Sequence, residues 1–244
     1  MMLFIIIFTC TLGLCHLVEY NAHLKFIQKD KERYHIKQLS ITLLNCIIQD
    51  FLIDYFVTNL EYHFTLFNII NGTVMFYFQD VYFYFGHRLM HSKRIYKYFH
   101  KMHHYYKSPN FWCCYYEHPI DHILVWVLPY LIIPYLLNIN FYIYWFVVFI
   151  TTLLSIEGHS GNDHSFKYWY IEYIFGIKTD IFSHNWLYNH SYHHDTHHLK
   201  TNCNYGLYTT LLDRVFGTLY INHDKCIIDN LKSEKQIFNS FLSS

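Results

Sequence analysis

The sequence predicts an all-α integral membrane protein with about four to five transmembrane helices and a cytosolic, helical, histidine-rich cap. Hydrophobic residues make up 53% of its 244 residues and charged residues only 15%, whereas soluble domains average about 25% charged residues. Several segments are apolar over the roughly 20 residues that a helix needs to cross a bilayer. The formal net charge is zero, so the chain has no basic excess with which to bind nucleic acid.

The N-terminal segment, residues 1–18, is apolar and contains no acidic or basic residue. A secretory signal usually begins with a basic region and ends at a small-residue cleavage site, and neither is clear here. We therefore expect a short membrane anchor. The stretch that follows, residues 25–37, is basic on balance and is expected on the cytosolic side of the membrane.

Two further spans are expected at residues 39–58 and 64–86, each long enough for a hydrocarbon core of about 30 Å. Polar groups are costly in lipid, so three acidic residues in these spans should face the protein interior: Asp50, Asp54 and Asp80. Residues 119–156 are the most apolar segment and suit two tight spans or a re-entrant hairpin, with Pro129 and Pro134 near the turn.

Histidine clusters lie on both sides of that last apolar segment. Five basic residues accompany the first cluster and place it in the cytosol by the positive-inside rule: Lys93, Arg94, Lys97, Lys101 and Lys107. An even number of crossings in 119–156 returns the chain to the same side. The two clusters are therefore expected to meet on the cytosolic face of the membrane.

The spacing of these histidines is helical. The first cluster contains sets spaced i, i+4 and i, i+3, i+4: His87 and His91, then His100, His103 and His104. The second forms one helical stripe: His190, His193, His194, His197 and His198. By chance the pattern HxxHH should occur roughly 0.1 times in such a chain. Aligned imidazoles without a metal lower one another's pKa by repulsion and gain little, whereas neutral imidazole binds Zn, Cu, Fe and Ni well.

The number of histidines indicates how many metals they would hold. At least eight have ligand spacing: His87, His91, His100, His103, His104, His194, His197 and His198. A mononuclear catalytic site needs about three or four protein ligands, so this number indicates two metals. Soluble di-iron bundles use carboxylates in Glu-x-x-His motifs, which these clusters lack. The sequence therefore predicts an almost all-histidine dinuclear site, and spacing alone leaves the metal open.

Three histidine boxes carry a resemblance to a known family. They read His87-Arg88-Leu89-Met90-His91, His100-Lys101-Met102-His103-His104 and His194-Asp195-Thr196-His197-His198. Four flanking strings agree in order and spacing: EHP at 117–119, EGHSG at 157–161, CNYG at 203–206 and LDRVFGT at 212–218. With these motifs, residues 80–219 resemble the membrane-bound fatty acid hydroxylase superfamily, which includes sterol desaturases and hydroxylases. The strings KRIYKYFHKMHH, HSG and HHDTHH are most similar to those of C-4 methylsterol monooxygenases.

The resemblance implies a di-iron centre in a multi-pass protein of the endoplasmic reticulum, with the histidine boxes facing the cytosol. Electrons would come from NAD(P)H through cytochrome b5 or its reductase. The resemblance also adds His159 and His193, so the expected ligand set is His87, His91, His100, His103, His104, His159, His193, His194, His197 and His198. It divides the chain into an N-terminal anchor and membrane region at 1–63, a catalytic domain at 64–219 and a C-terminal tail at 220–244. His118 is expected in a supporting role, and His190 only extends the stripe.

The implied chemistry is O2-dependent oxidation of a membrane lipid, most similar to C-4 methyl oxidation of a sterol. Carboxylates that accept the remote N–H of a ligand tune such sites, and three candidates are near the boxes: Asp80, Glu157 and Asp195. Asp80 lies seven residues before His87, on the same helical face.

Several alternatives stay open for the substrate and the function. Within the enzymes, they are a cholesterol 25-hydroxylase-like activity, C-5 sterol desaturation and acyl-lipid hydroxylation. Outside them stands a membrane metal-binding or transport protein. Two departures from the family pattern weaken an assignment by analogy. Asn162 replaces an aromatic residue, and about a dozen extra residues precede the third box, where a substrate lid could lie.

Overall fold

The computed structural model describes residues 3–21, 36–58, 60–161 and 191–220. These residues are helical, and no strand occurs among them. The expected basic loop, the insertion before the third box, His190 and nearly all of the C-terminal tail lie outside the described residues. The predicted all-α class is confirmed for the described part of the chain.

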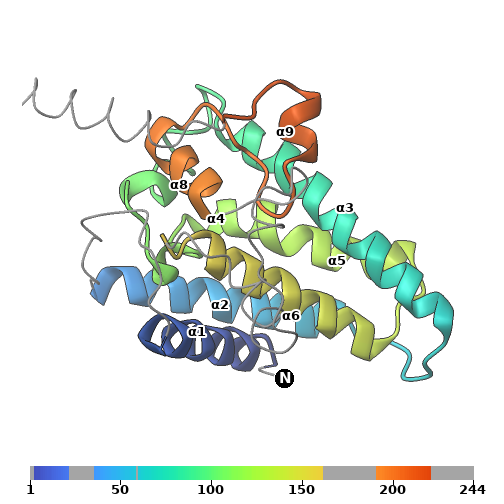
Figure 1. Ribbon diagram of the computed structural model, residues 1–244. Helices are drawn as coiled ribbons and strands as arrows, with labels where there is room; N and C mark the ends of the chain where they lie inside the picture. The colour runs from blue at the N-terminus through green and yellow to red at the C-terminus, as the bar shows by residue number, and fades with distance from the viewer. Residues whose placement is uncertain (1–2, 22–35, 59, 162–190, 221–244) are drawn as a thin grey trace, which may run out of the picture.

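The helices run through the described chain as follows (Figure 1): α1 Leu3–Asn21, α2 Ile36–Phe56, α3 Leu66–Met90, α4 Pro119–His122, α5 Leu128–Leu136, α6 Phe141–Gly158, α8 Ser191–Lys200 and α9 Leu211–Val215. A π-helical turn, Ile123–Val127, joins α4 to α5. Short 3-10 turns at His103–Tyr105 and Phe111–Cys113 lie between α3 and α4. The long helices α1, α2, α3 and α6 form a bundle, into which α4 and α5 pack, and α8 and α9 lie at one end of it.

Three helical stretches are long and apolar enough to cross a membrane: Lys37–Phe56, Pro119–Leu136 and Phe141–Gly158. They match the spans expected at 39–58 and, as two helices, at 119–156. The helices α1 and α3 match the other two expected spans in position but are not among the three, and α3 carries buried polar residues such as Asn68, Gln79 and Asp80. The total number of crossings therefore stays a prediction.

The two helices of the 119–156 segment are separated by a short reversal that ends in Asn140. The Asn140 side chain caps α6 by accepting from the backbone N–H of Tyr142 and Ile143. Pro134 lies in the last turn of α5, as expected, but Pro129 lies at the start of that helix. The π-helical turn ends just before this proline, with a bond from the N–H of Leu128 to the carbonyl of Ile123. Pro129 has no N–H to donate, so the π-helical pattern cannot continue through it.

Helices α3 and α6 begin side by side at the end of the bundle away from the histidines. The side-chain amide of Asn71 donates to the carbonyl of Asn138 there. At the next residue, a Cβ at Gly72 would lie only 2.6 Å from Cγ2 of Ile143. Glycine is therefore required for the two helices to approach so closely. Both helices then run toward the end of the molecule that carries α8 and α9.

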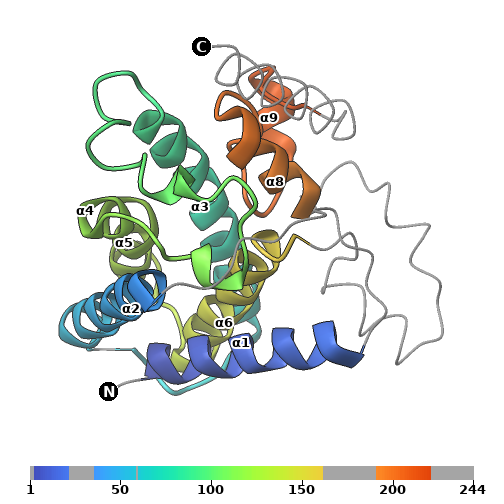
Figure 2. The same cartoon turned by 90° about the vertical axis from the view of Figure 1, so that its left-hand side faces the viewer.

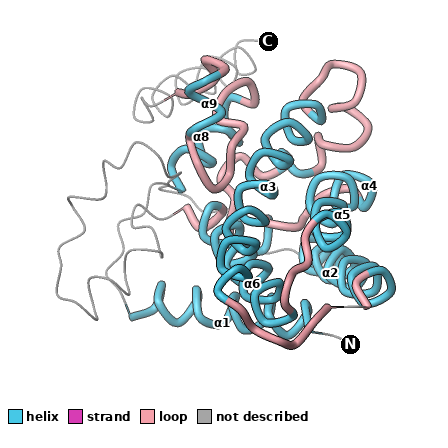
Figure 3. Tube along the Cα trace, turned by 90° about the vertical axis from the view of Figure 1, so that its right-hand side faces the viewer, coloured by secondary structure: helices cyan, strands magenta, loops and turns pink. Residues whose placement is uncertain are grey.

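The opposite end of the bundle gathers the histidine-bearing elements. In Figures 1 and 2, α8 and α9 lie beside the C-terminal end of α3, and α1 lies at the far side of the molecule. The loop from α8 to α9 returns to α3 (Figure 3), where the carboxylate of Asp80 accepts from the backbone N–H of Thr209 at 3.2 Å. The fold thus brings segments more than a hundred residues apart in sequence to one place.

Candidate metal centre

The histidines of the three boxes, together with His159, lie on four separate elements of the structure. The last turn of α3 carries His87, and His91 caps its C-terminus. The turn segment that follows carries His100 and leads to the 3-10 turn with His103 and His104. His159 caps the C-terminus of α6. The histidines of the third box lie on α8 and are buried.

These side chains form two groups, each with one ligand atom per residue and all such atoms within 4.8 Å of one another. The five-histidine group consists of His87, His91, His100, His104 and His197. The four-histidine group consists of His103, His159, His194 and His198. The groups are neighbours, since the rings of His104 and His198 lie 4.7 Å apart between centroids. The arrangement therefore offers two adjacent positions for a metal.

Within each group the Nε2 atoms converge. In the five-histidine group, Nε2 of His91 lies 3.3 Å from Nε2 of His87 and 3.0 Å from Nε2 of His197. In the four-histidine group, Nε2 of His194 lies 2.9 Å from Nε2 of His159 and 3.2 Å from Nε2 of His198. In each group, several Nε2 atoms therefore surround one position that a metal ion could occupy.

Hydrogen bonds made by Nδ1, the second ring nitrogen, determine the protonation of Nε2 in several of these histidines. Five ligands donate Nδ1–H to an oxygen: His87 to the Tyr205 carbonyl at 2.8 Å, His159 to the Ser155 carbonyl at 2.7 Å, His197 to the Cys203 carbonyl at 2.7 Å, His198 to the Tyr106 carbonyl at 3.1 Å and His100 to the Asp121 carboxylate at 2.6 Å. A carbonyl or carboxylate oxygen can only accept, so each Nδ1 carries the proton. In a neutral ring, Nε2 then carries no proton and has a free lone pair that can bind a metal.

Burial keeps the rings neutral. The pKa of His103, of His104 and of His194 lies well below its ordinary value, first because burial penalises the charged form and then because neighbouring imidazoles repel it. Burial also lowers the pKa of His159 to about 4, although the Ser155 carbonyl opposes the shift. Neutral rings with Nε2 lone pairs facing one another at about 3 Å repel, and a shared cation removes that repulsion.

The separations fit such a cation. A divalent metal bound to imidazole at about 2.1 Å holds cis nitrogens about 3.0 Å apart at a right angle and about 3.4 Å apart in a tetrahedron. The Nε2 pairs in direct contact are 2.9 Å to 3.4 Å apart, and all ligand atoms of a group lie within 4.8 Å of one another. The donor set and its spacing therefore suit two transition-metal ions.

Nine of the ten expected ligands lie in these two groups. The exception is His193, whose ring stacks on that of Tyr192 at 4.1 Å between centroids and lies outside both groups. On α8, His194, His197 and His198 share one face, and His193 lies at its edge, one turn before His197. His118 caps α4 instead, since its Nδ1 accepts from the N–H of Ile120.

Of the three carboxylates expected beside the histidines, Asp80 and Glu157 accept hydrogen bonds from groups other than the imidazoles. Asp80 accepts from the loop at Tyr208 and Thr209, not from His87. Seven residues of helix rise about 10 Å, so the shared face points Asp80 in the right direction but two turns too low. Glu157 accepts from the hydroxyl of Ser191 at 2.8 Å. Asp195 is buried on α8 among the histidines.

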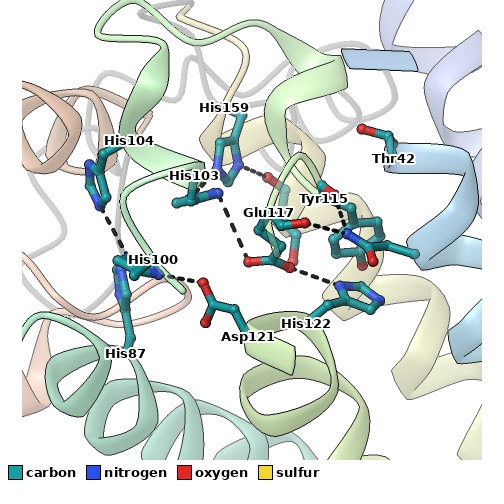
Figure 4. Close-up of polar contacts among 12 residues, drawn as sticks. Thr42, His87, His100, His103, His104, Tyr115, Glu117, Asp121, His122 and His159 are labelled. Atoms are coloured by element: carbon teal, nitrogen blue, oxygen red, sulfur yellow. Dashed lines mark hydrogen bonds and ion pairs between the residues drawn. The ribbon is translucent and has the colours of Figure 1, made fainter. Parts of the chain in front are cut away.

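Two other carboxylates reach the ligands, and sequence reasoning missed both. Asp121 bonds to His100 at 2.6 Å. Glu117 lies 4.0 Å from Nδ1 of His103, and its other oxygen accepts from Nδ1 of His122 at 2.8 Å (Figure 4). A signal was present, because these are the only acidic residues between positions 81 and 156. Each of the two histidine groups therefore has one carboxylate behind it.

Helix α2 holds the segment that carries these carboxylates. Its polar residues recur at helical spacing and face that segment: Thr42 donates to the carbonyl of Trp112 at 2.8 Å, and Asn45 donates to the carbonyls of Tyr115 and Glu117 at 2.9 and 3.0 Å. A membrane helix thus fixes the position of Glu117.

Of the three acidic residues expected to face the interior, Asp50 and Asp80 are buried, but Asp54 is exposed, because it lies near the end of α2.

Comparisons with known proteins agree with this geometry. Residues 72–218 match the family model described as fatty acid hydroxylase. The chain is 32% identical over 158 residues to methylsterol monooxygenase 1 of Rattus norvegicus and 31% identical over 159 residues to lathosterol oxidase of Homo sapiens, in each case covering 65% of this chain and 48% of the relative. It is 33% identical over 141 residues to the Delta(7)-sterol 5(6)-desaturase ERG3B of Gibberella zeae, covering 58% of this chain and 39% of the relative.

The chain therefore spans about half the length of the curated relatives it matches. No solved structure matches it significantly. The family match covers more than half of the chain and contains every histidine of the two groups. On these grounds, the chain belongs to the fatty acid hydroxylase family.

Proposed function

We propose that this protein is a membrane-bound, non-haem di-iron monooxygenase that oxidises a sterol with O2, and that its reaction is oxidation of the C-4 methyl group. The observation that carries the proposal is the pair of adjacent histidine groups with converging Nε2 atoms. Family membership supports iron as the metal at both positions. When bound there, two iron ions would supply the reduction of O2 and the oxidation of an unactivated C–H bond.

The chain's own residues would set the electronic character of that centre. Its nine ligands are neutral imidazoles, so they leave the positive charge of the metals in place. Asp121 and Glu117 offset part of this charge, Asp121 through a 2.6 Å bond to His100 and Glu117 from 4.0 Å behind His103. Through that bond Asp121 also keeps the proton of His100 on Nδ1, which leaves Nε2 to the metal.

The sterol part of the proposal rests on the relatives and on the lipid-like surface. The names of the three relatives refer to sterol chemistry. Large apolar side chains are exposed along α2 and α3, among them Phe51 and Phe67, and such a surface suits a bilayer in which a sterol is already dissolved. Sterol C-5 desaturation is the second candidate, because a relative named as a Delta(7)-sterol 5(6)-desaturase is 33% identical to the chain, against 32% for the methylsterol monooxygenase.

The surface above the five-histidine group supports an external electron donor. Between residues 81 and 116 the chain has no acidic residue and six basic ones: Arg88, Lys93, Arg94, Lys97, Lys101 and Lys107. Half-buried Tyr96, which lies between Arg94 and Lys97 in sequence, has its ring 5.4 Å from that of His91. We assign the donor to cytochrome b5 or its reductase, fed by NAD(P)H, because a basic surface attracts an acidic carrier.

The same charge pattern underlies the proposed location. Basic residues gather on the cytosolic side of membrane proteins, so we place both histidine groups at the cytosolic face of the endoplasmic reticulum. The three candidate spans carry the adjoining bundle. In this arrangement a sterol would approach the metals from the bilayer, and the electron carrier from the cytosol.

Expression in yeast that lacks C-4 methylsterol oxidase tests the reaction. Restored removal of C-4 methyl groups, with the product lost in the His104→Ala variant, is the expected result in lipid mass spectrometry. A C-5 desaturated, 25-hydroxylated or acyl-hydroxylated product would reject the C-4 assignment. Metal uptake into vesicles without any O2-dependent lipid product would reject the enzyme in favour of a metal transporter.

A further inference from the structure

The loop between α8 and α9 joins two of the five-histidine ligands through its backbone. The Cys203 carbonyl accepts from Nδ1 of His197 at 2.7 Å, and the Tyr205 carbonyl accepts from Nδ1 of His87 at 2.8 Å. Both of these histidines belong to the five-histidine group. The loop is therefore placed to orient that metal position.

A single buried carboxylate holds the loop in that position. One oxygen of Asp213 accepts from the N–H of Tyr205 at 2.9 Å, and the other accepts from the N–H of Gly206 at 2.8 Å. The hydroxyl of Thr218 donates to the first of these oxygens at 2.7 Å. Asp213 is 0% exposed. Because hydrogen bonds to an ionised carboxylate are stronger than neutral ones, this side chain fixes the peptide that carries the Tyr205 carbonyl.

A second carboxylate ties the far end of the same loop to α3. Asp80 accepts from the N–H of Tyr208 at 3.3 Å and from the N–H of Thr209 at 3.2 Å. His87 and Asp80 are on one helix, so the loop is attached to α3 both beside the ligand and two turns below it. At the near end, Asn204 has a φ of 54° and donates its side-chain amide to the carbonyl of His193.

We infer that Asp213 is a positioning residue for the five-histidine metal position, acting on His87 and His197 through the carbonyls of the loop it holds. This inference rests on the proposed binding of two metal ions. It also gives a physical role to the CNYG and LDRVFGT strings, which supply the two carbonyls and the carboxylate with its threonine. The buried charge of Asp213 would be costly if it served only to fold the loop.

The test uses Asp213→Asn in the full-length, detergent-solubilised protein. Asparagine keeps the shape and one acceptor oxygen but sets an NH2 group against the N–H of Gly206. Exposed Asp54, near the end of α2 away from the histidines, gives the matched control Asp54→Asn. Metal-free protein is titrated with Co2+ alone, and iron-loaded protein is measured by Mössbauer spectroscopy, so that neither readout depends on turnover.

We expect Asp213→Asn to weaken one of the two Co2+ binding events by roughly tenfold to a hundredfold, the usual effect of losing an outer hydrogen-bond partner of a ligand. The other event should stay unchanged, and the coupled iron pair should become an isolated ion. Thr218→Val should weaken the same Co2+ binding event, but by a smaller factor. If Asp213→Asn does not fold, the Co2+ titration of Thr218→Val tests the inference instead.

Three results would overturn the inference. Two unchanged Co2+ events in both variants would show that the loop does not orient the ligands. An equal weakening of both events would show a general structural role for Asp213. A wild type that binds no Co2+ would reject the proposed function together with this inference, whereas the first two results leave the proposed function standing.

Discussion

The two histidine groups differ in the number of ligands, in burial and in support. The five-histidine group includes a half-buried member, His91, which precedes the exposed basic residues Lys93 and Arg94 in sequence. All members of the four-histidine group are buried. Asp121 touches a ligand of the first group directly, whereas Glu117 stands 4.0 Å behind a ligand of the second.

This difference indicates a division of labour between the two positions. The five-histidine position is close to solvent, is tightly supported and suits the arrival of electrons. The four-histidine position is buried and has fewer histidines, which would leave more of a metal's coordination sphere open. The predictions that follow test whether the two groups are unequal in this way.

Loss of a ligand should have the largest effect. In His104→Ala, the five-histidine group loses a ring whose Nε2 lies 3.1 Å from those of both His91 and His197. We expect O2-dependent product to fall by more than the roughly hundredfold that an outer hydrogen bond can cost. Product is measured by lipid mass spectrometry on purified protein.

His193→Ala is the matched control for that variant. It removes a histidine that the sequence placed among the ligands but that lies outside both groups. Product and metal content should stay near those of the wild type. Equal losses in the two variants would contradict the division of the histidines into these groups.

The two supporting carboxylates should be unequal in effect. Asp121→Asn should weaken metal binding by about tenfold to a hundredfold, because it breaks a short bond to His100. Glu117→Gln should weaken it less, because His103 is 4.0 Å away. Competition with a chelator measures both affinities. A larger effect for Glu117→Gln would reverse the comparison of the two groups.

Acid should destabilise the protein through the buried imidazoles. The pKa of His159 is lowered to about 4 in the folded state, against about 6.5 in the unfolded chain. The unfolded state therefore binds more protons between these values, and stability falls as the pH is lowered from about 6.5 towards 4, by about 1.4 kcal/mol per unit for each such histidine. Thermal unfolding of metal-free protein across this range measures the effect, and a flat profile would contradict it.

The smallest effect is expected at the basic surface. A Lys97→Glu and Lys101→Glu double variant should slow reduction by an acidic electron carrier by about tenfold at low salt, and by less at high salt. Metal content should not change, because both side chains are exposed. An unchanged rate of reduction in stopped-flow measurements would place the arrival of electrons elsewhere.

Much of the site could be predicted from the sequence because helical spacing reports direction. The i, i+3, i+4 pattern identified His100, His103 and His104, and the structure brings all three into the two groups. Spacing does not report height along a helix or the position of a neighbouring loop. Asp80 was therefore wrong as a partner of His87, and the carbonyl of Tyr205 could not be foreseen.

The membrane fold was predictable for a similar reason and to a similar extent. Mean apolarity identified the spans that became α2 and α6. It did not show that polar residues of α2, such as Asn45, hold the segment behind the metal site. Such contacts depend on how segments far apart in sequence pack against one another, and composition alone does not indicate that packing.

The most direct test is the metal content of the purified wild-type protein after iron loading, read together with its Mössbauer spectrum. The account predicts about two iron ions per chain, in keeping with two ligand groups of sufficient size, and a spectrum of a magnetically coupled pair. Protein that binds no iron, or a single uncoupled iron ion, would contradict the claim that these histidines form a dinuclear centre.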